Sequence, residues 1–167
     1  MDFSNQDIIR LYGTRLYLVP DIEADIVEEE VAQIEPSPPD YSLLEKGPKV
    51  VWKLKPQAQL AFVLPEAEFG NRALTKILRD AVDAAGFDLS KIGFGVLPGS
   101  GEGWDFADMP VDLALVCQDF GQGWKSPIQW QGKRLYFSPS LTHVQQATDH
   151  KTALNQALKA VQAFLQA

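Results

Sequence analysis

The residues of this chain that could do chemistry lie in three loops, each of which follows an apolar run. The loops span residues 98–110, 119–126 and 138–141. Their carboxylates and hydroxyls include those of Asp105, Asp108, Asp119, Ser138 and Ser140. Two carboxylates can act as general acid and base, and a serine becomes a nucleophile beside an activating histidine. Neither serine lies in a Gly-x-Ser-x-Gly turn, and no spacing singles out a carboxylate pair, so we expect no catalytic residue.

Cofactor and metal motifs are also missing from the sequence. The glycine-rich stretch Gly99–Gly103 looks like a phosphate cradle, but no Lys-Ser or Lys-Thr pair follows it and no Gly-x-Gly-x-x-Gly opens a helix. We expect a flexible surface loop there. The two histidines, His143 and His150, fall near the C-terminal helices, and the single cysteine, Cys117, lies in an apolar run. This spacing predicts no metal site, and we expect no cofactor.

Aromatic residues in the loops point to contacts with a partner. Trp104 and Trp124 are expected at the surface, where such side chains anchor protein interfaces. An alternative for Trp104 and its neighbour Phe106 is that they fold back as a lid on the core. Ser140 is expected to cap a helix that runs from residue 141 to residue 147.

The composition is that of an ordinary globular protein. The 167 residues are 46% hydrophobic and 22% charged, which is enough to bury a core without disulfides or metal. One cysteine cannot form an internal disulfide, and the N-terminus has no basic start followed by an apolar run. No stretch approaches the roughly 18 apolar residues that cross a bilayer. We therefore expect a cytoplasmic protein without a membrane partner.

The negative charge of the chain is concentrated in one segment. The formal net charge is −7, but residues 20–48 carry nine acids and one lysine, and the remaining residues sum to +1. The main domain is thus not basic, and we do not expect direct binding of nucleic acid. The acidic segment is either a solvated linker or an electrostatic lure for a basic partner.

The elements that must position these loops are alternating strands and helices. An alternating pattern at residues 49–54 and apolar runs at residues 60–64, 92–97 and 113–117 predict strands. Residues 128–130 and 134–137 flank a turn at Gln131-Gly132. Residues after Asn71 and residues 149–164 show helical periodicity. This order predicts an α/β domain with a mostly parallel sheet and helices on both faces. Three prolines between residues 36 and 39 separate an N-terminal arm and linker, residues 1–48, from the domain at residues 49–167.

Several of these features together resemble the uracil-DNA-glycosylase-like family. Residues Leu74–Leu97 resemble the helix of those enzymes and the strand after it, and Leu113–Cys117 followed by Phe120-Gly121 resembles their third strand and its glycine turn. Residues 138–141, Ser-Pro-Ser-Leu, stand where the enzymes carry a His-Pro-Ser-Pro loop. The resemblance covers residues 49–165 and implies a three-layer α/β/α fold.

The sequence departs from that family at the positions that do its chemistry. Leu64 is followed by Pro65-Glu66-Ala67-Glu68-Phe69 in place of a Gly-x-Asp-Pro loop that activates water. Ser138 stands in place of the loop histidine. The resemblance thus implies that Ser138, Pro139, Ser140 and Leu141 form a degenerate active-site loop. Cleavage of a glycosidic bond would lack its base.

The order of segments also resembles a non-catalytic relative of that fold, the psi subunits of bacterial DNA polymerase III. Those proteins have a short arm, a linker, a degenerate glycosylase-like domain, a Ser-Pro-x-Leu loop and a helix. Their arm docks on the clamp loader and their domain holds the chi subunit. The resemblance implies protein partners of these two kinds. It also implies that the arm anchors are Ile9, Leu11, Tyr12, Leu16 and Tyr17.

Three alternatives remain open. Leu16, Tyr17 and Val19 could instead form an edge strand of the domain. The chain could be a glycosylase-like enzyme with altered chemistry, which would need a polar pocket at the loop ends. It could also be a lineage-specific binding protein with an unrelated partner.

Overall fold

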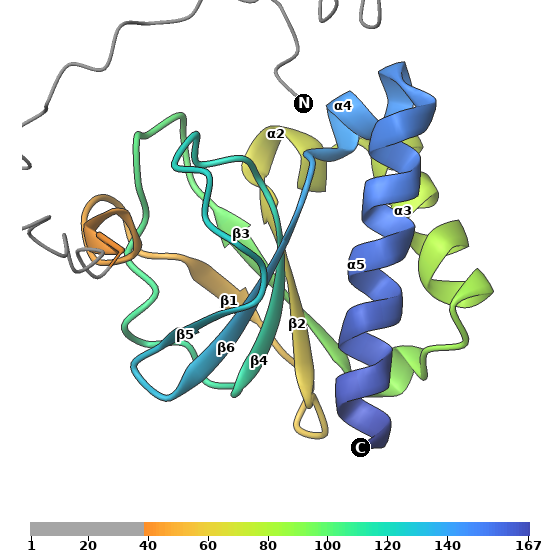
Figure 1. The fold of residues 1–167 in the computed structure, drawn as a ribbon, viewed down its shortest axis with the longest axis horizontal. Helices are drawn as coiled ribbons and strands as arrows, with labels where there is room; N and C mark the ends of the chain where they lie inside the picture. The colour runs from red at the N-terminus through yellow and green to blue at the C-terminus, as the bar shows by residue number, and fades with distance from the viewer. Residues whose placement is uncertain (1–38) are drawn as a thin grey trace, which may run out of the picture. The chain divides into compact units, whose positions relative to one another are not determined.

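The computed structural model describes residues 39–167, which form an α/β domain on one six-stranded sheet (Figure 1). The strands are β1 (Val51–Lys53), β2 (Leu60–Pro65), β3 (Ile92–Leu97), β4 (Leu113–Cys117), β5 (Ile128–Trp130) and β6 (Lys133–Ser138). The helices are α2 (Glu66–Phe69), α3 (Arg72–Ala84), α4 (Leu141–Gln146) and α5 (Thr148–Gln166), with 3₁₀ turns η1 (Ser42–Leu44) and η2 (Leu89–Lys91). The predicted α/β class is confirmed.

The sheet has a parallel centre and antiparallel edges. The strand order is β1-β3-β2-β4-β6-β5, in which β3, β2, β4 and β6 run parallel. β1 pairs antiparallel with β3, and β5 pairs antiparallel with β6 across the predicted turn at Gln131-Gly132. Both turn residues have positive φ, as a two-residue hairpin requires. Every residue of β4 is buried, which explains why this strand is a continuous apolar run.

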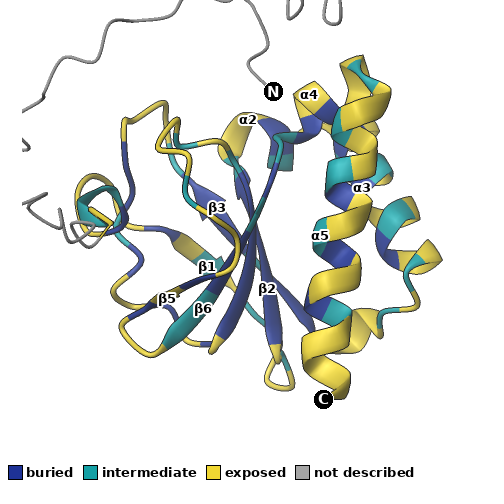
Figure 2. Ribbon diagram, viewed as in Figure 1, coloured by how far each residue is buried: buried dark blue, intermediate teal, exposed yellow. Residues whose placement is uncertain are grey.

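Two long amphipathic helices cover one face of the sheet. Asn71 caps α3 by accepting hydrogen bonds from the amides of Ala73 and Leu74, as the sequence predicts. The buried stripe of α3 is Leu74, Leu78 and Val82, and that of α5 is Leu154, Leu158 and Val161. Figure 2 shows both helices buried toward the sheet and exposed on the outer side. These stripes pack with β2 and β4 in one apolar core.

The opposite face of the sheet is covered by coil and a 3₁₀ turn, where the sequence predicts helices. A second core joins this face to side chains of η1 and of the loop after β3, including Leu44, Phe106 and Met109. In the part of the chain that the structure describes, the four helices are α2 to α5, and α3, α4 and α5 lie on the first side (Figure 1). The expected three-layer arrangement is therefore not confirmed, because coil and a 3₁₀ turn cover the second face.

Residues 39–48 belong to the domain rather than to the arm. The compact unit begins at Pro39, ahead of the predicted boundary at Lys49, and the rest of the predicted arm lies outside the described residues. The amides of Trp104 and Phe106 donate to the carbonyl oxygens of Leu43 and Leu44 at 2.9 Å. These bonds tie the segment to the loop after β3.

Gly103, the last glycine of the 99–103 stretch, allows that close approach. A Cβ placed on Gly103 would stand 2.6 Å from the carbonyl oxygen of Leu43 and 2.9 Å from that of Lys46. Any larger residue would push the two backbones apart. Close packing against residues 43–46 therefore explains why position 103 is a glycine.

Candidate functional site

The candidate site is a pocket at the carboxyl ends of β4 and β6, where parallel sheets place their ligands. Its volume is about 220 Å³. The residues that line it come from the loop after β4, the end of β6 and the starts of the last two helices. They are Gln118, Asp119, Phe120, Gln122, Gly123, Trp124, Phe137, Ser138, Pro139, His143 and His150. Sites for drug-sized ligands are larger, roughly 300–1,000 Å³, so this pocket has room for a side chain or a small group.

One wall of the pocket is a cluster of aromatic rings. The ring centroids of Phe120 and Trp124 are 5.2 Å apart, and both rings contact Phe137, at 5.8 Å and 5.7 Å respectively. Tyr41 meets Trp124 edge to face at 5.5 Å. We call these four residues the aromatic cluster. All four are half-buried, so each ring is held by its neighbours and still presents an edge or face to solvent.

The polar groups of the pocket are held by local hydrogen bonds. Asp119 Oδ1 accepts the amide of Gly121 at 2.8 Å, which fixes the turn after β4. The Nδ1 atom of His150 lies 3.1 Å from the carbonyl oxygen of His143, a distance that fits a bond donated by the ring. The two imidazole centroids are 5.5 Å apart. This wall can therefore offer hydrogen bonds to a group in the pocket.

A buried carboxylate holds the first turn of α4, the helix that brings His143 to the pocket. Glu68 is 5% exposed and lies in α2, directly after β2. Its Oε2 accepts the amide of Leu141 at 3.0 Å. Its Oε1 accepts the amide of Thr142 at 2.9 Å and the Thr142 hydroxyl at 2.7 Å. Both oxygens thus serve the first turn of α4, whose amides have no partner within the helix.

The Ser-Pro-Ser-Leu loop forms the junction between β6 and α4. Ser138 is the last residue of β6; it is buried and donates its hydroxyl to the carbonyl of Pro139 at 3.2 Å. Ser140 is the N-cap of α4 and accepts the amide of His143. Leu141 is fully buried in the core. Ser138 and Pro139 line the pocket, while Ser140 has the capping role that the sequence predicts.

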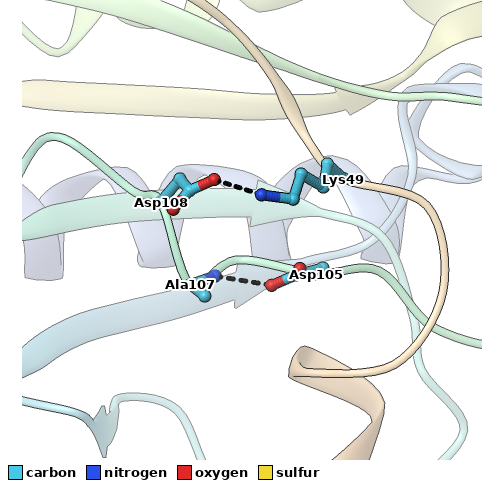
Figure 3. Close-up of polar contacts among 4 residues, drawn as sticks. All are labelled: Lys49, Asp105, Ala107 and Asp108. Atoms are coloured by element: carbon cyan, nitrogen blue, oxygen red, sulfur yellow. Dashed lines mark hydrogen bonds and ion pairs between the residues drawn. The ribbon is translucent and has the colours of Figure 1, made fainter.

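Two of the acids expected at the loop ends lie elsewhere. Asp108 pairs with Lys49 at 2.6 Å, and Asp105 accepts the amide of Ala107 at 2.8 Å (Figure 3). Neither carboxylate lines the pocket, because their loop has turned back toward the start of β4. Of the acids considered, Asp119 lines it. A polar pocket built from all three is therefore not formed.

The two loop tryptophans, Trp104 and Trp124, differ in burial. Trp104 is 4% exposed and donates its ring N–H to the carbonyl of Pro98 at 3.2 Å, so it is a core residue and not a surface aromatic. Phe106 is fully buried beside it in the second core. The alternative of a lid on the core thus holds for this pair. Trp124 keeps part of its surface, as expected.

The anchors expected in the arm lie outside the described residues. These are Ile9, Leu11, Tyr12, Leu16 and Tyr17. The structure adds Tyr41 and Phe137, which the sequence did not single out, and it gives Glu68 and Phe120, named only within resemblance segments, their roles at the site. The signals for Glu68 were its place soon after a predicted strand, where carboxyl ends gather at one edge, and its position in the segment that stands in place of the water-activating loop.

The single cysteine, Cys117, lies close to the site, but its thiol is buried and unreactive. Cys117 is the last residue of β4 and is fully buried. Burial raises the pKa of its thiol to about 12, because the thiolate would lose its hydration. A thiol that stays protonated is neither a nucleophile nor a ready metal ligand.

Comparisons with known proteins leave the family open. No protein-family model matches the chain, and no curated protein matches its sequence. Among residues 39–167, no group of three or more His, Cys, Asp or Glu residues is placed to hold a metal ion. Over the same residues, no helix has the length and apolar character to cross a membrane.

Proposed function

We propose that this chain is a protein-binding subunit that catalyses no reaction, and that the aromatic cluster beside the pocket is one of its contact surfaces. The observation that carries the proposal is the cluster itself. Four half-buried rings from three segments, η1 and its approach, the loop after β4, and β6, meet at one surface. Tyrosine and tryptophan rings that are already fixed bury large area with little loss of conformational entropy when a partner binds.

The role of Glu68 supports the absence of catalysis in this proposal. A general base must reach the water or substrate in the site, whereas Glu68 is 5% exposed and does not line the pocket. Both oxygens of Glu68 accept backbone or hydroxyl donors of α4. Removing any of these three bonds would leave a donor of the α4 turn without its acceptor. Glu68, which bonds to the degenerate active-site loop at Leu141, therefore stabilises the start of α4 and does not act as a base.

The identity of the partner follows from resemblance. We propose a degenerate uracil-DNA-glycosylase-like fold in which coil replaces one helical layer, and a place among psi-like accessory subunits of a bacterial replicative polymerase. The support is the parallel strand order together with the Ser-Pro-Ser-Leu loop at the end of β6. The partners would be clamp-loader and chi-like subunits in the cytoplasm. The arm anchors at residues 9–17 would contact the first of these.

Affinity capture with the full chain tests this proposal. The tagged protein should recover clamp-loader or chi-like subunits from a bacterial lysate, and Trp124→Ala should reduce recovery about tenfold or more. Phe164→Ala is the matched control, because Phe164 is an aromatic residue that is 41% exposed on α5, outside the pocket. Recovery of unrelated proteins only, or equal losses in both variants, would overturn the proposal. Excision of uracil from DNA by the pure protein would overturn it as well.

A second candidate function is an enzyme with altered glycosylase-like chemistry. The observation that favours it is the meeting of Asp119, His143 and His150 in one pocket. An imidazole is the commonest general base at neutral pH. Turnover of a nucleoside or deoxynucleotide substrate that His150→Ala abolishes, with folding intact by circular dichroism, would establish this candidate in place of the first.

A further inference from the structure

A second concave surface lies on the helical side of the sheet, away from the aromatic cluster. It runs between α3 and β3 and has a volume of about 350 Å³. Apolar side chains form its floor and one wall. They are Phe62, Phe69, Leu78, Val82, Ile92 and Phe94. We call this surface the α3 groove.

The α3 groove exists because the helical layer is narrower than the sheet. Six strands about 4.8 Å apart make a face roughly 29 Å wide. A helix with its side chains is about 10 Å wide, so about three are needed to cover that face. Two long helices, α3 and α5, stand on it, and α5 lies over β4 and β6. At the β1–β3 end the short helix α2 is the helix in close contact with β3, and within residues 39–167 no helix packs closely on β1, so this end of the face is the least covered.

Apolar residues at that end are exposed as a consequence. Val51 of β1 is 49% exposed, and Leu89 of η2 is 43% exposed. Phe69 and Phe94 are only half-buried, with ring centroids 5.8 Å apart. Leu89, Phe69 and Phe94 line the α3 groove together, and an exposed apolar surface of this kind marks an interaction site.

The rim of the α3 groove is basic. Lys55 lines it and donates to the carbonyl of Leu89 at 3.1 Å, which holds its ammonium over the opening. Arg79 lines the opposite side on α3, and the Lys53 ammonium lies 4.6 Å from the centre of the Phe69 ring. Within residues 39–167, no carboxylate forms an ion pair with any of these three cations.

Two of the acids on the neighbouring elements have partners of their own. Asp80 on α3 pairs with Lys76 at 2.6 Å. Asp88 before η2 accepts both the amide and the hydroxyl of Ser90. Asp88 attracts Lys55 through space, and Asp83 follows Arg79 by four residues on α3, so these two acids offset part of the charge of the three rim cations and leave a net positive charge for a ligand.

We propose that the α3 groove binds an acidic amphipathic helix of a partner protein. Its apolar face would complete the helical layer over β3 and β1, and its carboxylates would pair with Lys55 and Arg79. Helix-in-groove recognition of this kind uses apolar anchors one turn apart, with charges on the flanks. This surface is separate from the aromatic cluster, so the inference stands whether or not that cluster binds a partner.

A designed peptide probes the α3 groove directly. The ligand is a fluorescein-labelled helix with leucines on one face and glutamates on the other. Two control peptides carry lysines in place of the glutamates, or the same acidic composition in scrambled order. Titrated with the full chain, the acidic amphipathic peptide should bind at least about tenfold more tightly than either control.

Charge reversal in the protein locates the binding. The double variant K55E/R79E should weaken binding of the acidic peptide at least about tenfold. K151E/K159E is the matched control, since both lysines are exposed on α5 and the change in net charge is the same. Leu89→Gln removes an exposed apolar contact without opening the core, and it should weaken binding about fivefold.

Several results would overturn the inference. They are no binding of the acidic peptide, equal binding of the basic or scrambled peptide, and equal effects of the two charge reversals. Sedimentation of the full chain adds a further test. Self-association that K55E/R79E abolishes would assign the α3 groove to a second copy of the chain and would overturn the proposal of a partner helix.

Discussion

The carboxylate of Glu68 offers the sharpest test of the reasoning about the candidate site. We predict that Glu68→Ala destabilises the protein without affecting any chemistry, because this side chain holds the first turn of α4. It accepts three hydrogen bonds, from the Leu141 amide, the Thr142 amide and the Thr142 hydroxyl. Because bonds to a charged acceptor are stronger than neutral ones, their loss should be felt in global stability.

The magnitude follows from the burial of the donors. The bond to Leu141 is buried, so its amide would be left without an acceptor at a cost of about 2 kcal/mol. The two donors of Thr142 are partly accessible to water, which limits their loss to about 1 kcal/mol together. We expect the free energy of unfolding to fall by about 3 kcal/mol in Glu68→Ala. In Glu68→Gln one oxygen keeps Thr142, while the new NH₂ faces the Leu141 amide, so the fall should be about 2 kcal/mol.

Urea unfolding followed by tryptophan fluorescence measures these changes, since the chain has four tryptophans within residues 39–167. Glu66→Gln is the control on the same helix, because Glu66 is exposed and accepts one long bond from Gly99, at 3.4 Å. It should change stability by less than about 0.5 kcal/mol. A double-mutant cycle between Glu68→Ala and Thr142→Val should show a coupling of about 0.5–1 kcal/mol, because each change removes the hydrogen bond between these two side chains. A change below about 0.5 kcal/mol in Glu68→Ala, or strict additivity in the cycle, would refute the structural role.

Three further predictions concern the cores and the loop after β3. Burial raises the pKa of Cys117 to about 12, above its ordinary value of 9.0. The native thiol should therefore resist a disulfide reagent near pH 8 until guanidinium unfolds the chain; fast reaction of the native protein would contradict its burial. The raised pKa also means that the folded state keeps a proton that the unfolded state loses, so stability should fall as pH rises from about 9 through 12. Trp104→Ala should lower the free energy of unfolding by about 3–5 kcal/mol, because removal of a buried indole leaves a cavity. Urea unfolding measures this change. A decrease of less than about 1 kcal/mol would mean that the ring is not in the core. Gly103→Ala should lower it by about 2 kcal/mol or more, because its Cβ would meet the carbonyl of Leu43 at 2.6 Å, whereas Ala107→Gly in the same loop should cost about 1 kcal/mol or less.

The sequence predicted the elements of the domain well, because local patterns determine them. The continuous apolar runs of β2 and β4 required burial on both faces, and both became central parallel strands. Asn71, Ser140 and Gln131-Gly132 act through neighbours two or three residues away, so the caps and the hairpin turn could be found without knowing the fold.

The covering of the second face could not be predicted in this way. Alternation of strands and helices favours helices on both sides, yet the loop after β3 and the segment from residue 39 occupy one side instead. Their affinity for the sheet comes from Trp104, Phe106 and Leu44, which have no periodicity to mark them as core residues. For the same reason the sequence predicted Trp104 as a surface residue.

The site shows the same division between local and long-range information. By itself the sequence determined that loops rich in aromatic and acidic residues follow the parallel strands, and that Ser140 begins a helix. Only the tertiary structure decided that Asp105 and Asp108 turn away, and that Glu68 reaches α4 across more than seventy residues of chain. These outcomes depend on contacts between distant segments, whose energies come from burial and hydrogen bonding in three dimensions and leave no pattern along the chain.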